Sequence, residues 1–587
     1  MTAGLGRLGG LGSRGRAFVG GAPARDHAAA RGWLPGWAGA LLAALFGAAM
    51  VLWTFGLAPV DPWRQGWIWT GLGVDPPQLW LGWTFFRQSP WTLPPGANPD
   101  YGLELSSAIY FADAIPLLAL PLKALRGLVE VPQYIGPWLV LCGALQGLIG
   151  WRLVGLATRD PLARLCGAGL LALQPMLLHR MTGHTPLGGQ WTLLAGLLLA
   201  LGPGRGWWQG LAWAALLAVT TLVHSYLLAM LMPIWAADWL RRVLEPPRSP
   251  ALAMEAVAAP GAVLAALWAG GFFLLRGGFN TGPGHEHGTY GTWSFDLLGF
   301  LDPGLWSSLL PDLPDAGHWE AGTNYLGLGG ALLLAAGALA LWRRPTPLPR
   351  RLWPLAAALL ALLAFAVTHR PALAGHAWSL FEPSPRLLEA LGTLRNSNRM
   401  AWPLAYALLL GAIALAARAW GGRRTGLLLL GLLVVQVVDL APGLGRIRAG
   451  LAGAPVKVPQ ELSAPFWAEA AARYGRLRAV PGGNLGEGWE RLAPYAALNR
   501  LPTDAIYMAR VDTGATAALR AKVAGILASG AYEPGTFYVL RDAASLELAR
   551  GSAVPGRDLI RQVDEFWVLA PGWCAGREAA ACEAAAR

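Results

Sequence analysis

Charged residues are scarce in this chain. They make up 14% of its 587 residues, whereas hydrophobic residues make up 55%. Soluble globular proteins carry about 25% charged residues, so this composition excludes an ordinary soluble protein and predicts a polytopic membrane protein. Cysteine is also rare, with four residues, and no CxxC or other metal-ligand spacing occurs. The sequence has no nucleotide-binding glycine fingerprint, no P-loop and no internal repeat, which leaves nucleotide chemistry unsupported.

Positive charge is in excess, with a formal net charge of +12. In a membrane protein, excess lysine and arginine sets topology and binds anionic lipid headgroups, and no motif here supports a nucleic-acid partner. Residues 1–32 carry five arginines but no cleavable signal pattern, because the apolar run that follows is too long for a signal peptide. We expect 1–32 to be a disordered, basic cytoplasmic tail. The loop after the first helix then lies outside the cytoplasm.

Long apolar stretches fill the region 33–445. A spanning helix needs about 20 apolar residues, and the number of such stretches predicts about 10–13 transmembrane helices. The clearest are Leu34–Leu57, Ile135–Leu156, Leu211–Leu240, Leu326–Leu341, Leu352–Val367, Ala401–Ala417 and Leu427–Leu440, and the less clear ones are Ile109–Leu125, Leu162–Leu178, Leu187–Leu201 and Ala256–Leu275. Basic residues flank Ile135–Leu156 on both sides, so the topology in the middle of the chain stays open.

Two long polar loops, 59–104 and 277–325, interrupt the apolar region. The first combines acids with many tryptophans, whose amphipathic rings favour the membrane–water interface. The second is rich in Gly, Pro, Asn and Asp and is therefore irregular. If both loops face the same side, they can form opposite walls of one cavity.

Three aspartates in and after the first loop are candidate catalytic groups. Asp75 precedes Leu79, Trp80, Trp83 and Phe86, whose spacing predicts an amphipathic helix in the interface. Asp75 is then a helix N-cap, a catalytic carboxylate, or both. Asp113 falls inside the predicted apolar helix Ile109–Leu125, where an acid indicates function unless a nearby Ser or Tyr bonds it. Asp61 is a further alternative, although Asp61 and Asp100 fit turns, as does Asn98.

Basic and polar residues stand at the ends of later apolar segments. Arg180 and His184, beside His179 and Gln190, can bind a phosphate, or Arg180 simply reaches the membrane interface. Arg395 and Arg399 are four apart, so on a helix they share one face and suit a phosphate or diphosphate, or else lipid headgroups. Glu320 stands at the start of a membrane helix. His224 lies mid-helix and is expected to be a packed, hydrogen-bonded residue.

Metal binding has little support in the sequence. The group His285-Glu286-His287, with His318, lies in a flexible loop and does not have the spacing of a structural zinc site. No metal ligand is predicted, and the sequence leaves open whether a divalent metal is a cofactor.

Residues 457–587 change in character. Alternating runs predict short strands at RLRAV, AIYMARV, TFYVL and EFWVL, with helices at Glu487–Asn499, Thr513–Ser529 and Ala543–Gly551 between them. This predicts a small soluble α/β domain over 457–587, which we expect on the periplasmic side of the membrane. Cys574 and Cys582 either form a disulfide there or stay as two thiols.

The motifs together resemble the GT-C superfamily of integral-membrane glycosyltransferases, closest to an uncharacterised bacterial branch of domain-of-unknown-function type. The resemblance is carried by GVDPPQLWLGWTFFR, PPGANPDYG, YFADAIPLLALPLK, QYIGPWLVLCGALQG, HRMTGH, EAGTNYLGLG, RNSNRMAWP and FWAEAAARYG…APGW. It implies a mainly α, GT-C-like polytopic fold in the inner membrane, with the C-terminal α/β domain outside.

The resemblance also implies a function. It implies transfer of a sugar from a polyprenyl-phosphate donor to an envelope glycan, lipid or protein. Asp75 would be the base, with Asp61 and Asp113 as alternatives, and Arg395 and Arg399 would stabilise the departing phosphate. Asp75 is followed by two prolines rather than by the paired acids of several GT-C families, so metal dependence is not implied. The alternatives are a transporter or flippase for lipid-linked glycans, and a non-catalytic scaffold.

Overall fold

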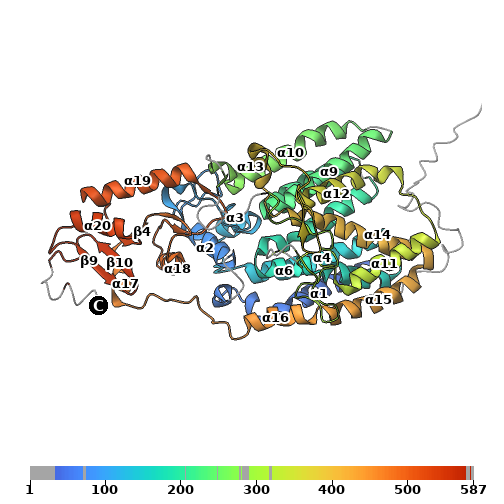
Figure 1. Cartoon of the computed structure of the whole chain (residues 1–587), viewed down its shortest axis with the longest axis horizontal. Coiled ribbons are helices and arrows are strands. Elements are labelled where there is room, and N and C mark those ends of the chain that lie inside the picture. The colour runs from blue at the N-terminus through green and yellow to red at the C-terminus, as the bar shows by residue number, and fades with distance from the viewer. Residues whose placement is uncertain are drawn as a thin grey trace, which may run out of the picture.

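The structure is a computed structural model of the chain, and it describes residues 34–70, 75–204, 206–246, 249–275, 279–280, 290–315, 320, 322–576 and 582. The predicted tail 1–32 and the group 285–287 with His318 lie outside these residues. The fold is mainly helical. Apolar helices form one body, and a smaller domain with strands lies at one end of the long axis of the molecule (Figure 1).

The apolar body is compatible with a multi-pass membrane protein. Among the described residues, five helical segments are long and apolar enough to cross a membrane, or up to seven if each of two bent helix pairs is one span. The helices of this body, several of them shorter apolar segments, are α1 (Gly36–Phe55), α4 (Ile135–Val154), α5 (Pro161–Ala172), α6 (Pro175–Thr182), α7 (Trp191–Leu201), α8 (Trp207–Val223), α9 (Ser225–Leu244), α10 (Ala251–Gly270), α11 (Gly327–Arg343), α12 (Trp353–Val367), α14 (Trp402–Trp420), α15 (Gly422–Asp439) and α16 (Ala441–Leu451).

Small residues bring the apolar helices into close contact. A Cβ atom added to Gly47 of α1 would lie 1.9 Å from the Gly143 carbonyl of α4, and one added to Gly147 would lie 2.0 Å from the Ala43 carbonyl. The same holds where Gly337 of α11 meets Ala412 of α14. Close backbone approach of this kind gives the dispersion contacts that hold helices together in a bilayer, where burial from water no longer drives association.

Three predicted helices differ from the structure. The stretch Leu211–Leu240 is two helices, because the backbone of His224 is extended, with φ −168° and ψ 140°. Ile109–Leu125 is helical only over α3 (Pro116–Ala124), since Asp113 and Ile115 have positive φ values of 51° and 45°. Residues Leu162–Leu178 form α5 and α6, which meet at an angle of 45°. Each break lies where polar groups interrupt the apolar pattern.

The short helix α3 explains where Lys123 and Arg126, the basic residues before α4, lie. With nine residues, α3 is too short to cross a membrane. Lys123 lies over the rings of Phe86 and Trp91, at 3.9 and 4.6 Å from their centroids, and Arg126 donates to the carbonyl of Arg87. Both cations therefore belong to the same body as the first loop, and only the arginines after α4 lie at its other end.

The first loop is folded into the interior. Its helix α2 (Asp75–Gln88) is almost fully buried, and the rings of Trp67, Trp80 and Trp83 are no more than 2% exposed. The prediction of an amphipathic helix lying in the interface is therefore wrong for α2. The indole N–H of Trp80 donates to Gln65 and that of Trp83 to the Val131 carbonyl, so these rings are core residues; Trp63 and Trp91 are the exposed ones.

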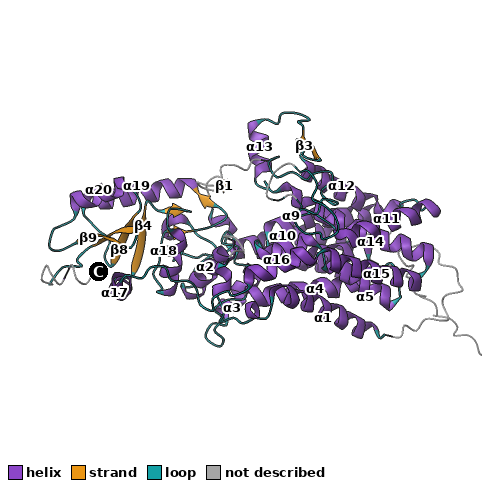
Figure 2. Ribbon diagram, turned by 60° about the horizontal axis from the view of Figure 1, so that its bottom comes forward, coloured by secondary structure: helices purple, strands orange, loops and turns teal. Residues whose placement is uncertain are grey.

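The C-terminal domain is built on a four-stranded sheet of order β4-β8-β10-β9, in which β4 and β8 are parallel and the other pairs antiparallel. The chain reaches it from α16 through an extended linker, seen along the lower edge of the molecule in Figure 1, and Figure 2 shows the strands of the domain in orange. Its elements are α17 (Pro465–Arg473), β4 (Arg476–Val480), β5 (Gly483–Asn484), α18 (Trp489–Leu498), β6 (Ala505–Ile506), β7 (Val511–Asp512), α19 (Thr513–Ser529), β8 (Thr536–Leu540), α20 (Ala543–Ser552), β9 (Leu559–Val563) and β10 (Phe566–Ala570).

Strand β9 was not predicted, and AIYMARV is only in part a strand. Residues Thr503–Asp512, here called the docking segment, bond to the first loop and the turn after it, and they also contact β4 of the sheet, where Thr503 bridges to Leu477. The N–H of Gly102 donates to the Thr503 carbonyl, the N–H of Thr503 to the Asp100 carbonyl, and the N–H of Ala509 to the Phe111 carbonyl. Short strands β1 (Phe279–Asn280) and β7 also pair, so the domain is joined to both long polar loops. Two further short strands, β2 (Ala372–Leu373) and β3 (His376–Ala377), and α13 (Pro385–Gly392) lie before α14.

A buried guanidinium reinforces this junction. Arg478 of β4 is 1% exposed and pairs with Glu104 of the first loop at 2.7 Å, with Asp504 at 3.1 Å and with Glu533 at 2.6 Å. Glu104 and Glu533 also pair with Lys522, at 2.6 and 3.1 Å, whereas the buried Asp504 has Arg478 as its one ion-pair partner among the described residues. The structure also pairs Cys574 with Cys582 in a disulfide.

We expect Arg478→Met to destabilise the protein by about 3–5 kcal/mol, because it leaves the buried Asp504 carboxylate without an ion-pair partner. Arg476→Met is the matched control, since Arg476 is 40% exposed and makes a single 3.4 Å pair with Glu533. Thermal unfolding of the full chain in detergent measures both. Equal melting temperatures for the two variants would contradict this role of Arg478.

Candidate functional site

One cavity lies where the apolar helices, the first loop and the docking segment meet. Its volume is about 400 Å³. Five of the predicted site residues line it, namely Asp75, Asp113, His184, Arg395 and Arg399. The remaining walls include Tyr110, Phe111, His224, Tyr226, Phe272, Trp293, Tyr507 and Arg510.

Asp75 is held by two partners from distant parts of the chain. It begins α2, and its Oδ1 accepts a hydrogen bond from the Tyr507 hydroxyl at 3.1 Å, while Nδ1 of His184 lies 3.0 Å from its Oδ2. Burial raises the pKa of Asp75, and the Tyr507 hydrogen bond opposes that rise. Burial also lowers the pKa of His184 well below its ordinary value, so His184 is neutral and its Nδ1–H donates to the carboxylate.

Glu320 lies beneath the cavity as the centre of a buried ion cluster. Its carboxylate pairs with Arg180 and, at 2.6 Å, with Arg399, and these three side chains are at most 2% exposed. Asn398 and Asn396 donate to the same carboxylate at 3.2 and 3.4 Å. The cluster holds two cations and one anion, and it joins α6 to the start of α14.

The predicted arginine pair is therefore split. Arg395 and Arg399 do not share a helix face, because Arg395 precedes the 3₁₀ turn Ser397–Ala401 that contains Arg399. Arg399 is engaged by Glu320, whereas Arg395 lies over the Trp293 ring at 5.4 Å in the cavity wall. A second arginine, Arg510 of the docking segment, lines the same cavity as Arg395.

Arg395 and Arg510 form no ion pair with any carboxylate of the described residues. Arg510 donates only to the carbonyls of Ala509 and Thr393, at 3.2 and 3.3 Å. Burial, and then the charge of Arg510, lower the pKa of Arg395 to about 10, so both guanidiniums are charged near neutral pH. Two adjacent cations in one cavity can bind an anionic ligand.

Asp113 and His224 form a second carboxylate–imidazole pair in the cavity, with His224 Nε2 3.8 Å from Asp113 Oδ1. Asp113 lies in an irregular turn and not inside an apolar helix, which corrects the prediction. His224 lies at the break between α8 and α9, and not mid-helix. Burial, with the charge of Asp75 second, raises the pKa of Asp113 to about 7.

Two predicted residues lie elsewhere. Asp61 is about half exposed, and its Oδ1 accepts from the Trp63 N–H in a turn. Asn98 is buried, where its amide donates to the Gly82 carbonyl and fixes the first loop against α2. Neither lines the cavity.

Sequence reasoning missed Tyr507 and Arg510. Both lie in AIYMARV, which has the alternation of a strand, so its side chains were assigned to a sheet. The available signal was a tyrosine and an arginine in a short run that ends at Asp512. The Asp512 carboxylate caps the next helix by accepting a hydrogen bond from the Ala515 N–H. Contact with a loop some 400 positions earlier leaves no local pattern.

No group of three or more His, Cys, Asp or Glu side chains that could hold a metal occurs among the residues that the structure describes. Each of the two carboxylates of the cavity lies beside a histidine, Asp75 beside His184 and Asp113 beside His224.

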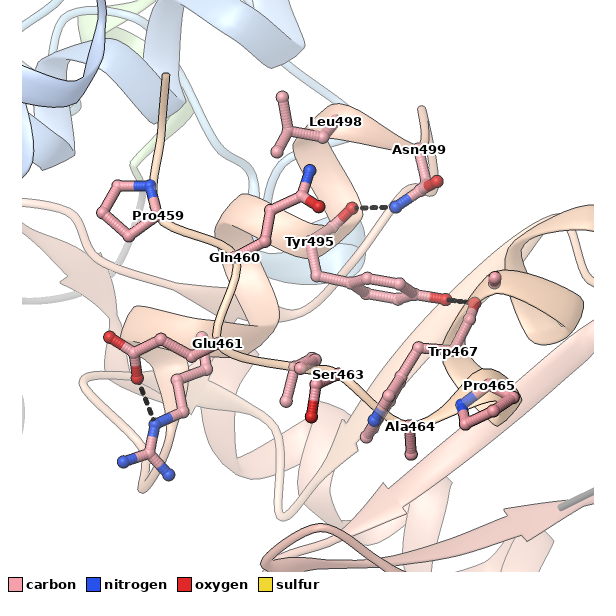
Figure 3. Close-up of a pocket in the computed structure, with 13 residues that line it drawn as sticks. Pro459, Gln460, Glu461, Ser463, Ala464, Pro465, Trp467, Tyr495, Leu498 and Asn499 are labelled. Carbon is pink, nitrogen blue, oxygen red and sulfur yellow. Dashed lines mark hydrogen bonds and ion pairs between the residues drawn. The ribbon is translucent and has the colours of Figure 1, made fainter. Parts of the chain in front are cut away.

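A second cavity of about 400 Å³ lies in the C-terminal domain between the linker residues Pro459–Pro465 and α18 (Figure 3). Its charged groups are paired with each other, as Arg491 is with Glu461 at 2.7 Å, so it offers less chemistry.

These features define a mainly helical protein, compatible with multiple membrane passes, whose C-terminal α/β domain completes a cavity at one end of the helices. Residues 44–441 match the family described as domain of unknown function (DUF6311), and residues 466–571 match the DUF6311 C-terminal domain. The chain belongs to this family. None of the curated proteins matches it. The predicted uncharacterised family is thus confirmed, and the GT-C superfamily stays a prediction.

We expect Asp113→Asn to stabilise the protein at high pH. The folded pKa of about 7 lies above the ordinary 3.8, so the stability that this group gives is complete below about pH 4 and is lost as the pH rises through 7. The asparagine variant removes that loss. Its advantage in unfolding free energy should grow by about 2 kcal/mol or less between about pH 5.5 and about pH 8.

Thermal unfolding of the full chain at the two pH values measures this difference. Asp61→Asn is the control, because Asp61 is exposed and outside the cavity. An advantage for Asp113→Asn that stays the same at both pH values would show that Asp113 is ionised throughout.

Proposed function

We propose that the protein is a membrane glycosyltransferase that moves a sugar from a polyprenyl-phosphate donor to a cell-envelope glycan, lipid or protein. The observation that carries the proposal is the cavity itself. It places a carboxylate–imidazole pair, Asp75 with His184, and two arginines without carboxylate partners, Arg395 and Arg510, around one space. Proton acceptance and phosphate binding are the two requirements of this transfer.

The distribution of arginine supports an outer location for the cavity. Helices α9 and α14 start beside the cavity residues His224 and Arg399, so their other ends lie away from it. Arginine clusters at or just after those far ends, and likewise after α4 and α11, as Arg152, Arg159, Arg164, Arg241, Arg242, Arg343, Arg344, Arg418, Arg423 and Arg424. Short basic loops face the cytoplasm, which leaves the cavity and the C-terminal domain on the periplasmic side of a bacterial inner membrane.

Asp75 is the proposed base. Its carboxylate is oriented by Tyr507 and by neutral His184, and burial raises its pKa toward the range in which a base works near neutral pH. It removes the proton of an acceptor hydroxyl as that oxygen forms a bond to the anomeric carbon of the donor sugar. Asp61 has no such part, since it lies outside the cavity.

The same step breaks the bond between the anomeric carbon and the donor phosphate oxygen. The electron pair stays with the phosphate, whose negative charge grows, and Arg395 and Arg510 stabilise it. Arg399 also lines the cavity and contributes less, because Glu320 already offsets its charge in part. The balance is one proton on Asp75, a glycosylated acceptor and a polyprenyl phosphate.

An aromatic wall suits a lipid-borne donor. Tyr110, Phe111 and Phe272 line the cavity and contact one another edge to face or tilted, with centroids 5.3–5.6 Å apart. The wall continues outward along α10 and the turn after it, where Trp268 and Phe273 are 47% and 49% exposed. An apolar path from the cavity to the outside of the helices is what a polyprenyl chain requires.

A transporter or flippase accounts less well for these features. It needs charged groups at several depths along the helices. The ionisable residues of the cavity instead come from helix ends, turns and the docking segment. A non-catalytic scaffold does not require Arg395 and Arg510 to line a cavity without carboxylate partners.

We expect Asp75→Asn to lower sugar transfer by about 10²–10⁴-fold, because asparagine keeps the shape of the site but does not accept the proton. Membranes that contain the full chain, given radiolabelled polyprenyl-phosphate hexoses, measure incorporation into envelope material. Asp61→Asn should retain wild-type transfer. Full transfer by the Asp75 variant would remove the base from this scheme.

Arg510→Ala should weaken binding of polyprenyl phosphate about tenfold or more, since an ion pair to a partly buried phosphate is lost. Arg510→Lys should recover part of the affinity, because lysine keeps the charge without the fork of N–H groups. The exposed Arg550→Ala is the control for net charge. Binding can be measured by native mass spectrometry of the detergent-solubilised chain, and equal affinity in the Arg510→Ala and Arg550→Ala variants would place the phosphate elsewhere.

A further inference from the structure

The transfer scheme leaves Asp113 and His224 without a part, although both line the cavity. Asp113 comes from the turn before α3, and its side chain is 14% exposed. Within the described part of the chain no group donates a hydrogen bond to its carboxylate. A largely buried carboxylate without a donor is costly, so the site is arranged for a donor that a ligand brings.

The hydrogen bond by which His224 caps α9 determines which of its ring nitrogens carries the proton. The extended backbone of His224 lets its ring cap α9, and Nδ1 accepts a hydrogen bond from the Tyr226 N–H at 3.1 Å. Burial lowers the pKa of His224 to about 3, so the ring is neutral. With Nδ1 as the acceptor, the single ring proton is on Nε2, the atom that faces Asp113.

The distance between His224 and Asp113 is too long for a direct hydrogen bond, but it allows one oxygen atom to hydrogen-bond to both. His224 Nε2 and Asp113 Oδ1 are 3.8 Å apart, whereas N–H···O hydrogen bonds measure about 2.7–3.2 Å. One oxygen atom at about 2.8 Å from each fits between them. Where Asp113 is ionised, above its pKa of about 7, that atom must accept a hydrogen bond from Nε2–H and donate one to the carboxylate. A hydroxyl group does both, whereas a carbonyl or a phosphate oxygen without its proton does not.

The backbone of Asp113 is specific to this arrangement. Its φ of 51° is in the left-handed region, which Asp, Asn and Gly adopt more readily than other residues. The turn directs the carboxylate into the cavity rather than along a helix. Tyr226, whose ring centroid lies 5.7 Å from that of His224, adds an apolar face beside the gap.

We propose that Asp113 and His224 form a subsite that binds one hydroxyl group of a carbohydrate ligand through a two-sided bridge. Identifying the hydroxyl as that of a sugar rests on the proposed function. The subsite makes Asp113 a residue for recognition, distinct from Asp75, whose two oxygens already contact Tyr507 and His184. Sugars that lack or invert this hydroxyl bind more weakly.

The test uses saturation-transfer NMR of the full chain in detergent, with methyl α-glucoside, α-mannoside and α-galactoside and their monodeoxy derivatives as probes. We expect at least one parent glycoside to bind about tenfold more tightly than one of its monodeoxy forms, which reflects a charge-assisted hydrogen bond. In Asp113→Gly and in His224→Asn this gap should close. Glycine tolerates the positive φ, and asparagine still caps α9 but lacks the reach of Nε2.

Asp61→Asn is the control and should keep the gap, because Asp61 is about half exposed and lies outside the cavity, and melting temperatures show whether each variant is folded. Equal binding of every parent and deoxy form to the wild type, no binding of any glycoside, or a gap that persists in both variants would overturn the subsite. No lipid donor is present in this measurement. A protein that discriminates the deoxy forms but transfers no sugar would therefore keep the subsite and refute the transferase.

Discussion

Two guanidinium groups share one buried carboxylate in this protein, and the site is built on that constraint. Glu320 holds Arg180 at the end of α6 and Arg399 at the start of α14, with all three side chains shielded from water. Removing Glu320 would leave two buried cations without a counter-ion, and breaking a buried pair in this way costs about 3–5 kcal/mol. The cluster therefore fixes the end of α6, from which the chain continues to His184, and the turn that follows Arg395. Two of the proposed catalytic groups depend on it for their positions.

The cavity is composite because an apolar helix body has few places for charge. Ionisable groups are costly within a bilayer unless they are paired, so they gather where helices end and where other segments shield them. Here the first loop folds inward as the buried helix α2, and the docking segment of the C-terminal domain closes the space with Tyr507 and Arg510. The C-terminal domain is thus part of the proposed site as well as attached to it. Its buried Arg478, which bridges to Glu104, explains how a separate domain is held at a defined distance.

Local pattern predicted the apolar helices and most of the C-terminal domain, because hydrophobic periodicity is a property of neighbouring residues. The helices Thr513–Ser529 and Ala543–Ser552 and the strands Arg476–Val480 and Thr536–Leu540 are examples. Asp75, Asp113, His184 and Arg395 were singled out because charge in an apolar context is conspicuous. What failed depended on distant contacts. The break at His224, the capture of Arg399 by Glu320 and the docking of AIYMARV on the first loop have no local signature, since each partner is more than 70 positions away or is set by backbone geometry.

The most direct test of a transferase with this composite cavity is a cryo-electron microscopy structure of the full chain with polyprenyl phosphate bound in a lipid nanodisc. A phosphate between Arg395 and Arg510, with Asp75 facing the position of the sugar carbon and the lipid chain leaving along Phe272, is the expected result. A phosphate bound elsewhere, with the arginines of the cavity unchanged and the cavity open only to water, would contradict it.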